Sequence, residues 1–398
     1  MPDSYVAVCI GWNIMRIWFT LFYIVKFIGV GFLAPYVAMF FLRNGFSNLQ
    51  AGFLVGLISF VGFVAQPLWG IVSDRYMLTK RLITISCFST AVIILGYLIV
   101  DNFNYLVLVV IGYSIMRAPL HANVAALALS YLEENGKKEE FGSLRLWGSA
   151  GYIVATFASG ALLFEGDLDI AIYIFSGCCL ILGFMSFMLP ERRVYSDVDI
   201  MQGAGLVIKN SDLRLFLIGI IFIGITLGAS DQYLAIYMDE INSAAWIVGA
   251  AVALTALPEI PLMRFAEWFI ARWGIRNVFV IGVSVLPIRW IFNIYVTDPY
   301  IAFPVQVLHG IAMSALLSVG VIYVDNIVSE SLRASGQSLY LASLYGLGPS
   351  IGLFLAGILM ESEGATTRPL WVVCLVTGTL GSILINSSMK KKDLREIA

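Results

Sequence analysis

The chain has 398 residues, of which 60% are hydrophobic and only 13% are charged. Soluble domains carry about 25% charged residues, so this composition excludes an ordinary soluble protein. The formal net charge of −2 offers no basic surface for nucleic acid, so we expect no nucleic-acid partner.

Long apolar stretches follow one another along the chain, separated by short polar breaks. A helix that spans a bilayer needs roughly 20 mostly apolar residues, and its backbone amides are all paired internally. The stretches are continuous rather than alternating, which excludes a transmembrane β-barrel. The sequence therefore predicts an all-α membrane protein with twelve spans, near residues 17–42, 47–71, 81–100, 104–132, 143–164, 168–189, 213–238, 244–268, 277–296, 300–327, 336–361 and 369–388.

Basic residues are distributed unevenly between the loops. The loops on one side carry most of them, including Arg75, Lys80, Arg81, Arg192, Arg193, Arg272 and Arg276. The loops on the other side carry only Arg43 and Arg368. Because cytoplasmic loops are enriched in Lys and Arg, we predict a multi-pass protein of the cell (inner or plasma) membrane with both termini in the cytoplasm.

The longest polar break, residues 191–212, falls at the middle of the chain. We predict that it is a cytoplasmic linker between an N-terminal six-helix bundle, residues 1–190, and a C-terminal six-helix bundle, residues 213–398.

The two halves are related by a constant offset of 197 residues. The offset relates Tyr36 to Tyr233, and it also relates the pairs Gly52 and Gly249, Arg75 and Arg272, Gly151 and Gly348, and Gly160 and Gly357. Because each half holds six spans, an even number, the copies face the same way across the membrane. This pattern predicts two parallel six-helix pseudo-repeats, the arrangement of major facilitator transporters.

The loop between the second and third predicted spans reads QPLWGIVSDRYMLTKRLI, residues 66–83. Gly70, Asp74 and Arg75 in it resemble the gating-loop motif of the major facilitator superfamily, whose acid latches the halves in one state. The alternative is a loop that only follows the positive-inside rule, although that rule does not require Asp74. The second copy has Ala271 in place of the acid, so we expect a one-sided latch.

Several ionisable residues fall inside the predicted spans. An ionisable group at mid-membrane costs roughly 3 to 10 kcal/mol or more, and such groups persist when they pair or line a watery pathway. The set contains both cations and acids, namely Lys26, Arg117, His121, Arg145, Asp231, Glu259, Arg289 and His309. We expect mutual pairing across a wet cavity to offset part of their desolvation.

Several of these residues lie in segments that resemble the lactose-permease-like branch, which includes oligosaccharide, phenylpropionate and nucleoside proton symporters. Residues 141–152, FGSLRLWGSAGY, are similar to the start of helix 5 in that branch, and the resemblance implies that Arg145 and Tyr152 contact the solute. It also implies that four residues of the second half couple transport to protons, namely Asp231, Glu259, Arg289 and His309.

The chain also departs from that branch. Ala312 replaces an acid that carries the proton in the lactose permease, and His121 and Asn123 lie where a helix-4 acid is expected. Lys26 is an additional cation. These changes make the cavity more positive, which favours a solute with a carboxylate or another anionic group.

Two of the acids have structural alternatives. Glu259 could be only the partner of Arg289 or of Arg264, instead of a proton carrier. Asp231 could lie near the outer end of its helix and be solvated there.

The same holds for three of the bases. His309 could only donate a hydrogen bond to a neighbour, and Arg145 could extend to the cytoplasmic surface. Arg117 could pair with Glu259 or with Asp231, and the sequence does not choose between them.

We therefore predict a proton-coupled symporter that imports a small polar or anionic organic solute, such as a sugar or an aromatic carboxylate, by alternating access. We expect it to be a monomer, with no metal and no cofactor. The predicted solute-binding residues are Lys26, His121, Asn123, Arg145 and Tyr152. A proton-driven efflux carrier and a transporter-like sensor without flux are the alternatives. The absence of HExxH and GxSxG motifs argues against an intramembrane enzyme.

The glycine-rich segment YGLGPSIG, residues 345–352, is not preceded by a predicted strand. We therefore expect Gly346, Gly348 and Gly352 to serve close helix packing rather than phosphate binding.

Overall fold

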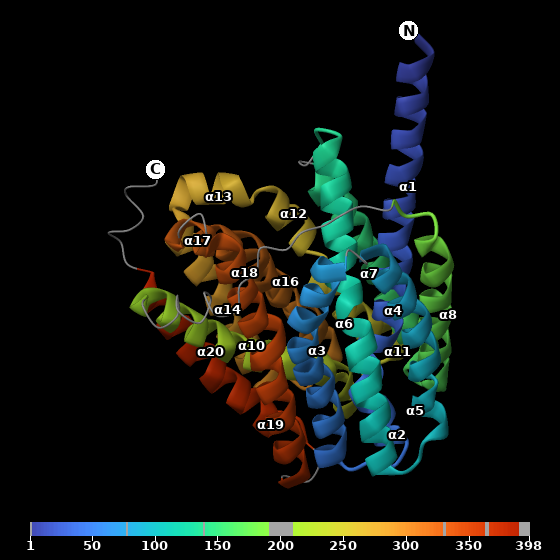
Figure 1. Ribbon diagram of the computed structural model, residues 1–398. Coiled ribbons are helices and arrows are strands. Elements are labelled where there is room, and N and C mark those ends of the chain that lie inside the picture. The colour runs from blue at the N-terminus through green and yellow to red at the C-terminus, as the bar shows by residue number, and fades with distance from the viewer. Residues whose placement is uncertain are drawn as a thin grey trace. The chain divides into compact units, whose positions relative to one another are not determined.

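The computed structural model describes residues 2–76, 79–137, 140–190, 210–328, 332–362 and 366–389. Every regular element within these residues is a helix (Figure 1). Twelve helices, some made of consecutive elements, are long and apolar enough to cross a membrane. This confirms the predicted all-α membrane protein with twelve spans. The predicted linker lies outside the described residues, except for 210–212.

The chain folds into two compact units. The first unit comprises Met1–Ala34 and Val64–Ser196, and the second comprises Pro35–Phe63 and Asp197–Ala398. Residues 35–63 therefore group with the second half of the chain. The division into bundles at 1–190 and 213–398 stays a prediction.

The first unit contains most of the helices that precede the linker. They are α1 (Pro2–Leu33), the C-terminal part of α3 (Asn48–Tyr76), α4 (Thr79–Ile94), α5 (Gly96–Ile99), α6 (Phe103–Glu134), α7 (Phe141–Leu163) and α8 (Asp169–Ser186). Asn102 caps the start of α6, because its side chain accepts hydrogen bonds from the backbone amides of Asn104 and Tyr105.

The second unit contains the remaining helices. They are η1 (Ala34–Tyr36), α2 (Val37–Arg43), the N-terminal part of α3, α10 (Ser211–Glu240), α11 (Ala245–Ala256), α12 (Glu259–Arg264), α13 (Ala266–Trp273), α14 (Ile275–Tyr295), α15 (Pro299–Val305), α16 (Val307–Ser314), η3 (Ala315–Gly320), α17 (Val321–Ile327), α18 (Arg333–Ala342), η5 (Ser343–Leu347), α19 (Gly348–Ser362) and α20 (Arg368–Ser388). Two of them, η3 and η5, are π-helical.

Prolines explain why the eighth span is not one continuous helix. The predicted span 244–268 is divided, because α11 ends at Ala256 and α12 begins at Glu259. Pro258 lies at the break and Pro261 follows it, and neither has a backbone amide to donate to the preceding turn. The break places Glu259 at the first turn of a short helix.

Glycines hold α1 against α7 in the first unit. A Cβ atom at Gly151 would lie 3.0 Å from the carbonyl oxygen of Ile24, and one at Gly31 would lie 3.1 Å from the carbonyl oxygen of Tyr152. The backbones of the two helices therefore touch without side chains between them, as is common where membrane helices pack closely.

The second unit repeats this contact at the predicted offset of 197 residues. A Cβ atom at Gly348 would lie 2.7 Å from the carbonyl oxygen of Ile221, and one at Gly228 would lie 3.1 Å from that of Pro349. The same positions of α10 thus meet the start of α19. The paired contacts confirm the pseudo-repeat, and they confirm that Gly348 serves helix packing.

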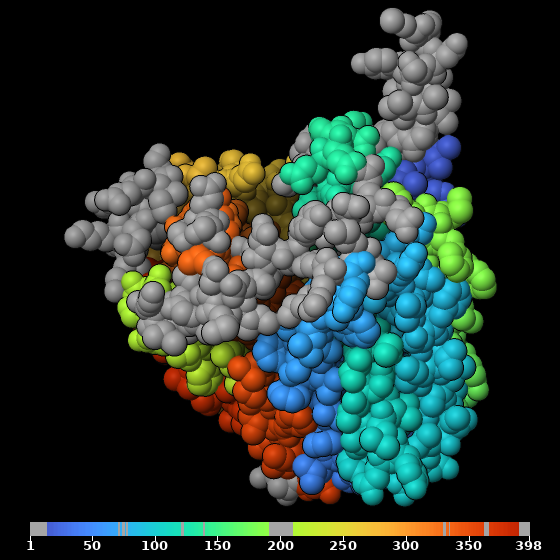
Figure 2. All heavy atoms as spheres, viewed as in Figure 1, coloured from blue at the N-terminus to red at the C-terminus, as the bar shows by residue number. Residues whose placement is uncertain are grey.

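The second unit also contains a close contact between α3 and α19, both near the lower edge of Figures 1 and 2. A Cβ atom at Gly52 would lie 2.7 Å from the backbone nitrogen of Gly357. The amide of Leu49 donates a hydrogen bond to the Glu361 carboxylate over 3.1 Å. These contacts explain why residues 35–63 belong to the second unit.

We expect Gly151→Val to destabilise the protein, because the added side chain would overlap the backbone of Ile24. Overpacking of this kind costs about 1–3 kcal/mol, and each kcal/mol lowers the Tm of a 150–250-residue domain by roughly 2–4 °C. Thermal unfolding in detergent measures the effect. Gly177→Val is the matched control, because a Cβ atom there meets no described atom within 4 Å. Equal Tm values for the two variants would contradict the packing role of Gly151.

Candidate functional site

A buried arginine is the centre of a polar network in the second unit. Arg289 lies on α14 and its side chain has no solvent exposure. Its Nε donates a hydrogen bond to Gln306 Oε1 over 2.8 Å, and its Nη1 lies 3.3 Å from Ser230 Oγ and 3.0 Å from His309 Nδ1. The contacts join α10, α14 and α16.

The contact with Arg289 fixes the tautomer of His309. A guanidinium group has five N–H donors and no acceptor, so His309 Nδ1 must accept the hydrogen bond. The imidazole is therefore neutral and carries its proton on Nε2. Asp231 Oδ1 lies 3.7 Å from the same Nδ1 atom, beyond hydrogen-bond distance.

Asp231 supplies a negative charge beside this network. Its side chain is 53% exposed, whereas the side chain of His309 is 7% exposed. Ser230, its neighbour on α10, links it to Arg289, because Ser230 Oγ lies 3.4 Å from Asp231 Oδ1. A buried cation is very costly without a counter-charge and hydrogen bonds. Asp231 provides the charge, and Nε and Nη1 of Arg289 are bonded, whereas its Nη2 has no hydrogen-bond partner among the described residues.

Gln306 is a member of the network that the sequence analysis missed. It is fully buried. Its side-chain nitrogen donates to the carbonyl oxygen of Ala302 over 2.9 Å and lies 3.4 Å from Asn293 Oδ1. These contacts orient its oxygen towards Arg289. The sequence signal that could have identified Gln306 is its position as a polar residue within an apolar span, three residues before His309.

Glu259, predicted to act with these residues, is the first residue of α12 and is half-buried. Among the described residues, Arg289 bonds to Gln306, Ser230 and His309 rather than to Glu259. The helix of Glu259 nevertheless approaches α16, because a Cβ atom at Gly310 would lie 2.7 Å from the Pro258 ring. The structure thus brings together three of the four predicted coupling residues.

A second set of charged residues lies in the first unit. Lys26 is 7% exposed, and its Nζ lies 5.8 Å from the ring centroid of Tyr23 and 5.3 Å from that of Phe27. Arg117 and Arg145 are close enough for their charges to act on Lys26. Three predicted cations therefore form one positive cluster.

The members of this cluster differ in exposure. Arg117 is half-buried, and its guanidinium carbon lies 5.8 Å from the ring centroid of Tyr113. Arg145 is exposed, near the start of α7. Tyr152 is half-buried on the same helix, seven residues further along.

Asn123 is 8% exposed, and its side-chain nitrogen is buried without a hydrogen-bond acceptor among the described residues. The side chains of His121, Asp74 and Arg75 lie outside the described part of the chain. Gly70 lies on α3, where a Cβ atom would meet no described atom within 4 Å. Packing in this structure therefore does not require a glycine there.

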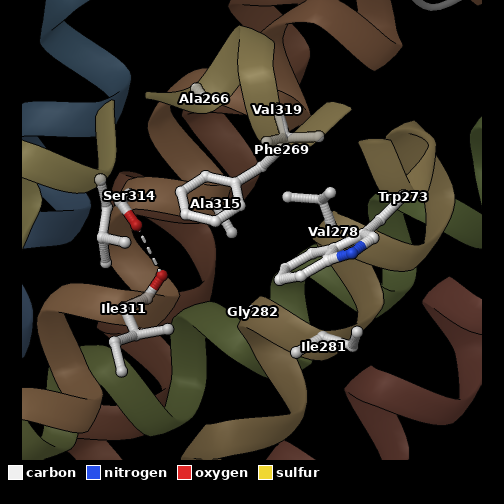
Figure 3. Close-up of a pocket in the computed structure, with 11 residues that line it drawn as sticks. Ala266, Phe269, Trp273, Val278, Ile281, Gly282, Ile311, Ser314, Ala315 and Val319 are labelled. Atoms are coloured by element: carbon white, nitrogen blue, oxygen red, sulfur yellow. Dashed lines mark hydrogen bonds between the residues drawn. The ribbon is translucent and has the colours of Figure 1, made fainter. Parts of the chain in front are cut away.

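An apolar pocket in the second unit is separate from both polar sets. Its volume is about 100 Å³, and its walls come from α12, α13, α14, α16 and η3 (Figure 3). The Ser314 hydroxyl in its wall already donates to the carbonyl oxygen of Ile311 over 2.8 Å. The only other polar side-chain atom in the wall is the indole nitrogen of Trp273. This lining offers little to orient a polar solute.

We expect solution-state ¹⁵N NMR of histidine-labelled protein to show His309 as a neutral imidazole with its proton on Nε2. The chain has only two histidines, so His121→Asn assigns the remaining signals. Arg289→Gln should change the Nδ1 resonance, because it removes the charged donor. An imidazolium, or a proton on Nδ1, in the unaltered protein would contradict this arrangement.

The sequence model of the MFS_1 like family matches residues 16–370. The uncharacterized transporter YwbF of Bacillus subtilis (strain 168) is 27% identical over 346 residues, with 85% of each chain covered. Maltose permease of Geobacillus stearothermophilus is 23% identical over 372 residues, covering 92% of this chain and 93% of the permease.

The crystal structure of the nucleoside transporter NupG has the same fold. It matches with a TM-score of 0.82 and 20% identity, over 95% of this chain and 100% of NupG. The comparisons confirm the family resemblance that the sequence predicts. This protein belongs to the MFS_1 like family and is a major facilitator membrane transporter rather than an enzyme.

Proposed function

We propose that this protein is a proton-coupled symporter of the cell membrane, with both termini in the cytoplasm. It imports a small polar or anionic organic solute as a monomer, by alternating access. The observation that carries this proposal is the contact of His309 Nδ1 with Arg289 and, at 3.7 Å, with Asp231. The names of maltose permease and of the nucleoside transporter support a polar solute.

His309 is the proton switch in this proposal. In the neutral state its Nδ1 lone pair accepts from Arg289. A proton on Nδ1 removes that lone pair and places two cations 3.0 Å apart, so the contact with Arg289 breaks. The new N–H lies along the former lone pair, so the imidazole must turn away from Arg289 before it donates to Asp231, whose Oδ1 lies 3.7 Å away. A charge-assisted hydrogen bond of about 1.5–3 kcal/mol then replaces the lost one. Protonation thus replaces the hydrogen bond between His309 and Arg289 with one between His309 and Asp231.

The exchange couples proton binding to the conformation of the second unit, because the partners lie on different helices. Asp231 is on α10, His309 on α16 and Arg289 on α14. A shift in equilibrium requires a difference in affinity between two states, and the neutral and protonated forms of His309 bond to partners on different helices. Glu259, the first residue of α12, serves as a second proton acceptor. Asp74 and Arg75, with Gly70, form the latch.

The solute binds to the first unit through the positive cluster of Lys26, Arg117 and Arg145. Asn123, Tyr152 and His121 complete the binding residues. The rings of Tyr23 and Phe27 beside the Lys26 ammonium suit an aromatic ring that bears a carboxylate. An anion there offsets the mutual repulsion of three cations.

Uptake into proteoliposomes tests this function. A thermal-shift screen of sugars, nucleosides and aromatic carboxylates first supplies a ligand. With an inward proton gradient of one pH unit, one-to-one coupling accumulates this ligand about tenfold, because one pH unit equals 1.36 kcal/mol. We expect Asp231→Asn and Glu259→Gln each to lose this accumulation but to keep ligand exchange, because each variant lacks one of the two acids proposed to take part in proton coupling.

Glu267→Gln is the matched control, because Glu267 is exposed on α13. It should accumulate ligand as the unaltered protein does. Full accumulation by the Asp231 variant would overturn the proton assignment. Binding without flux would indicate a sensor, and accumulation only under the reverse gradient would indicate an efflux carrier.

A further inference from the structure

The guanidinium of Arg289 rests on an aromatic pair. Its carbon atom lies 4.5 Å from the ring centroid of Trp290. The Trp290 ring stacks on that of Trp371, with centroids 5.6 Å apart and an angle of 5° between the planes. Neither ring has any solvent exposure. The pair joins α14 to α20, which pack together in the second unit (Figure 1).

Packing alone fixes the Trp290 ring. Its indole nitrogen is buried and has no acceptor among the described residues. Gly378 on α20 makes room for it, because a Cβ atom there would lie 3.3 Å from this nitrogen. The ring is therefore held by Trp371 on one part of α20 and by the bare backbone of Gly378 seven residues further along.

Hydrogen bonds fix the Trp371 ring. Its indole nitrogen donates to Thr367 Oγ1 over 3.1 Å. Thr367 has one hydroxyl proton, which it donates to Glu240 Oε2 over 2.6 Å, and its backbone amide donates to the same oxygen over 2.8 Å. Thr367 precedes α20, and Glu240 is the last residue of α10. A carboxylate thus ties the end of one helix to the start of another.

Tyr237 supports this tie from the last turns of α10. Its ring meets that of Trp371 edge to face, with centroids 5.5 Å apart. Its hydroxyl donates to the carbonyl oxygen of Val296, just after α14, over 2.9 Å. The ends of α10 and α14 and the start of α20 are therefore joined around one indole ring.

We propose that Thr367, Trp371 and Trp290 are positioning residues that set the orientation of Arg289, and through it the hydrogen bond to His309. The Glu240–Thr367 pair, at the helix ends, controls the network at mid-helix. A movement of the start of α20 relative to the end of α10 reaches Arg289 through two stacked rings. The consequence for transport rests on the proposed function, whereas the consequence for His309 does not.

The test uses Thr367→Val, which keeps the branched shape but removes the hydroxyl, and Trp371→Phe, which keeps an aromatic ring but removes its donor. The first readout is the ¹⁵N resonance of His309 in the full-length protein, with His121→Asn as background. Both variants should shift the Nδ1 resonance, because Arg289 moves. Thr367→Ser should restore it.

Thr379→Val is the matched control on the same helix. Thr379 is exposed on α20, and its hydroxyl donates only to the carbonyl oxygen of Leu375 over 2.7 Å. It should leave the His309 signals unchanged. Thermal unfolding of all variants gives the loss of Tm in each. If general destabilisation caused the shift of the His309 resonance, Thr379→Val would show the same shift as another variant with the same loss of Tm.

The second readout is the ratio of proton-driven uptake to ligand exchange. We expect Thr367→Val to lower this ratio about tenfold, the size expected when a charge-assisted hydrogen bond is lost. A shifted His309 signal without proton-driven uptake by the unaltered protein would refute the proposed function but keep the positioning role. Unchanged His309 signals in both Thr367→Val and Trp371→Phe would overturn the positioning role itself.

Discussion

The burial of the Arg289 guanidinium is the constraint on which the second unit depends. A cation without solvent exposure inside an apolar helix bundle needs hydrogen bonds and a nearby counter-charge to offset the cost of its burial. Gln306, Ser230 and His309 provide the acceptors, and Asp231 provides the charge. Because these partners come from α10, from α16 and from the residue before it, the positions of the helices and the charge state of the network are linked. A change in either must change the other.

The two units share a scaffold but not their chemistry. The glycine contacts of α1 with α7 recur between α10 and the start of α19 at an offset of 197 residues. At the same offset, Asp231 corresponds to Ala34, Arg289 to Val92 and His309 to Gly112, while Lys26 corresponds to Ile223. The repeat therefore supplies packing, and each copy adds its own ionisable groups. This asymmetry favours separate roles, with protons handled in one unit and an anionic group bound in the other.

Local sequence signals predicted most of the fold. The twelve spans were predictable from the lengths of the apolar stretches, which depend only on residues close in sequence. The paired glycines were predictable from the repeat, because they lie at a constant offset. The break at Pro258 was readable as well, although the span was predicted as continuous. The grouping of residues 35–63 with the second half was not predictable, since it depends on contacts such as that of Gly52 with Gly357.

For the site, charge in an apolar span identified Arg289, His309 and Asp231. Neutral partners such as Gln306, Thr367 and Trp371 resemble ordinary core residues until their contacts are known.

The most direct test of proton coupling is the number of protons that the purified protein exchanges when it binds ligand. Titration in weakly buffered detergent solution, using the ligand from the thermal-shift screen, measures this number across pH. Linkage requires that a network shared by proton and solute makes the binding of one depend on the other. We expect measurable proton exchange by the unaltered protein, and ligand binding without proton exchange by a variant that combines Asp231→Asn, Glu259→Gln and His309→Gln. The same proton exchange in that triple variant would contradict proton coupling through these residues.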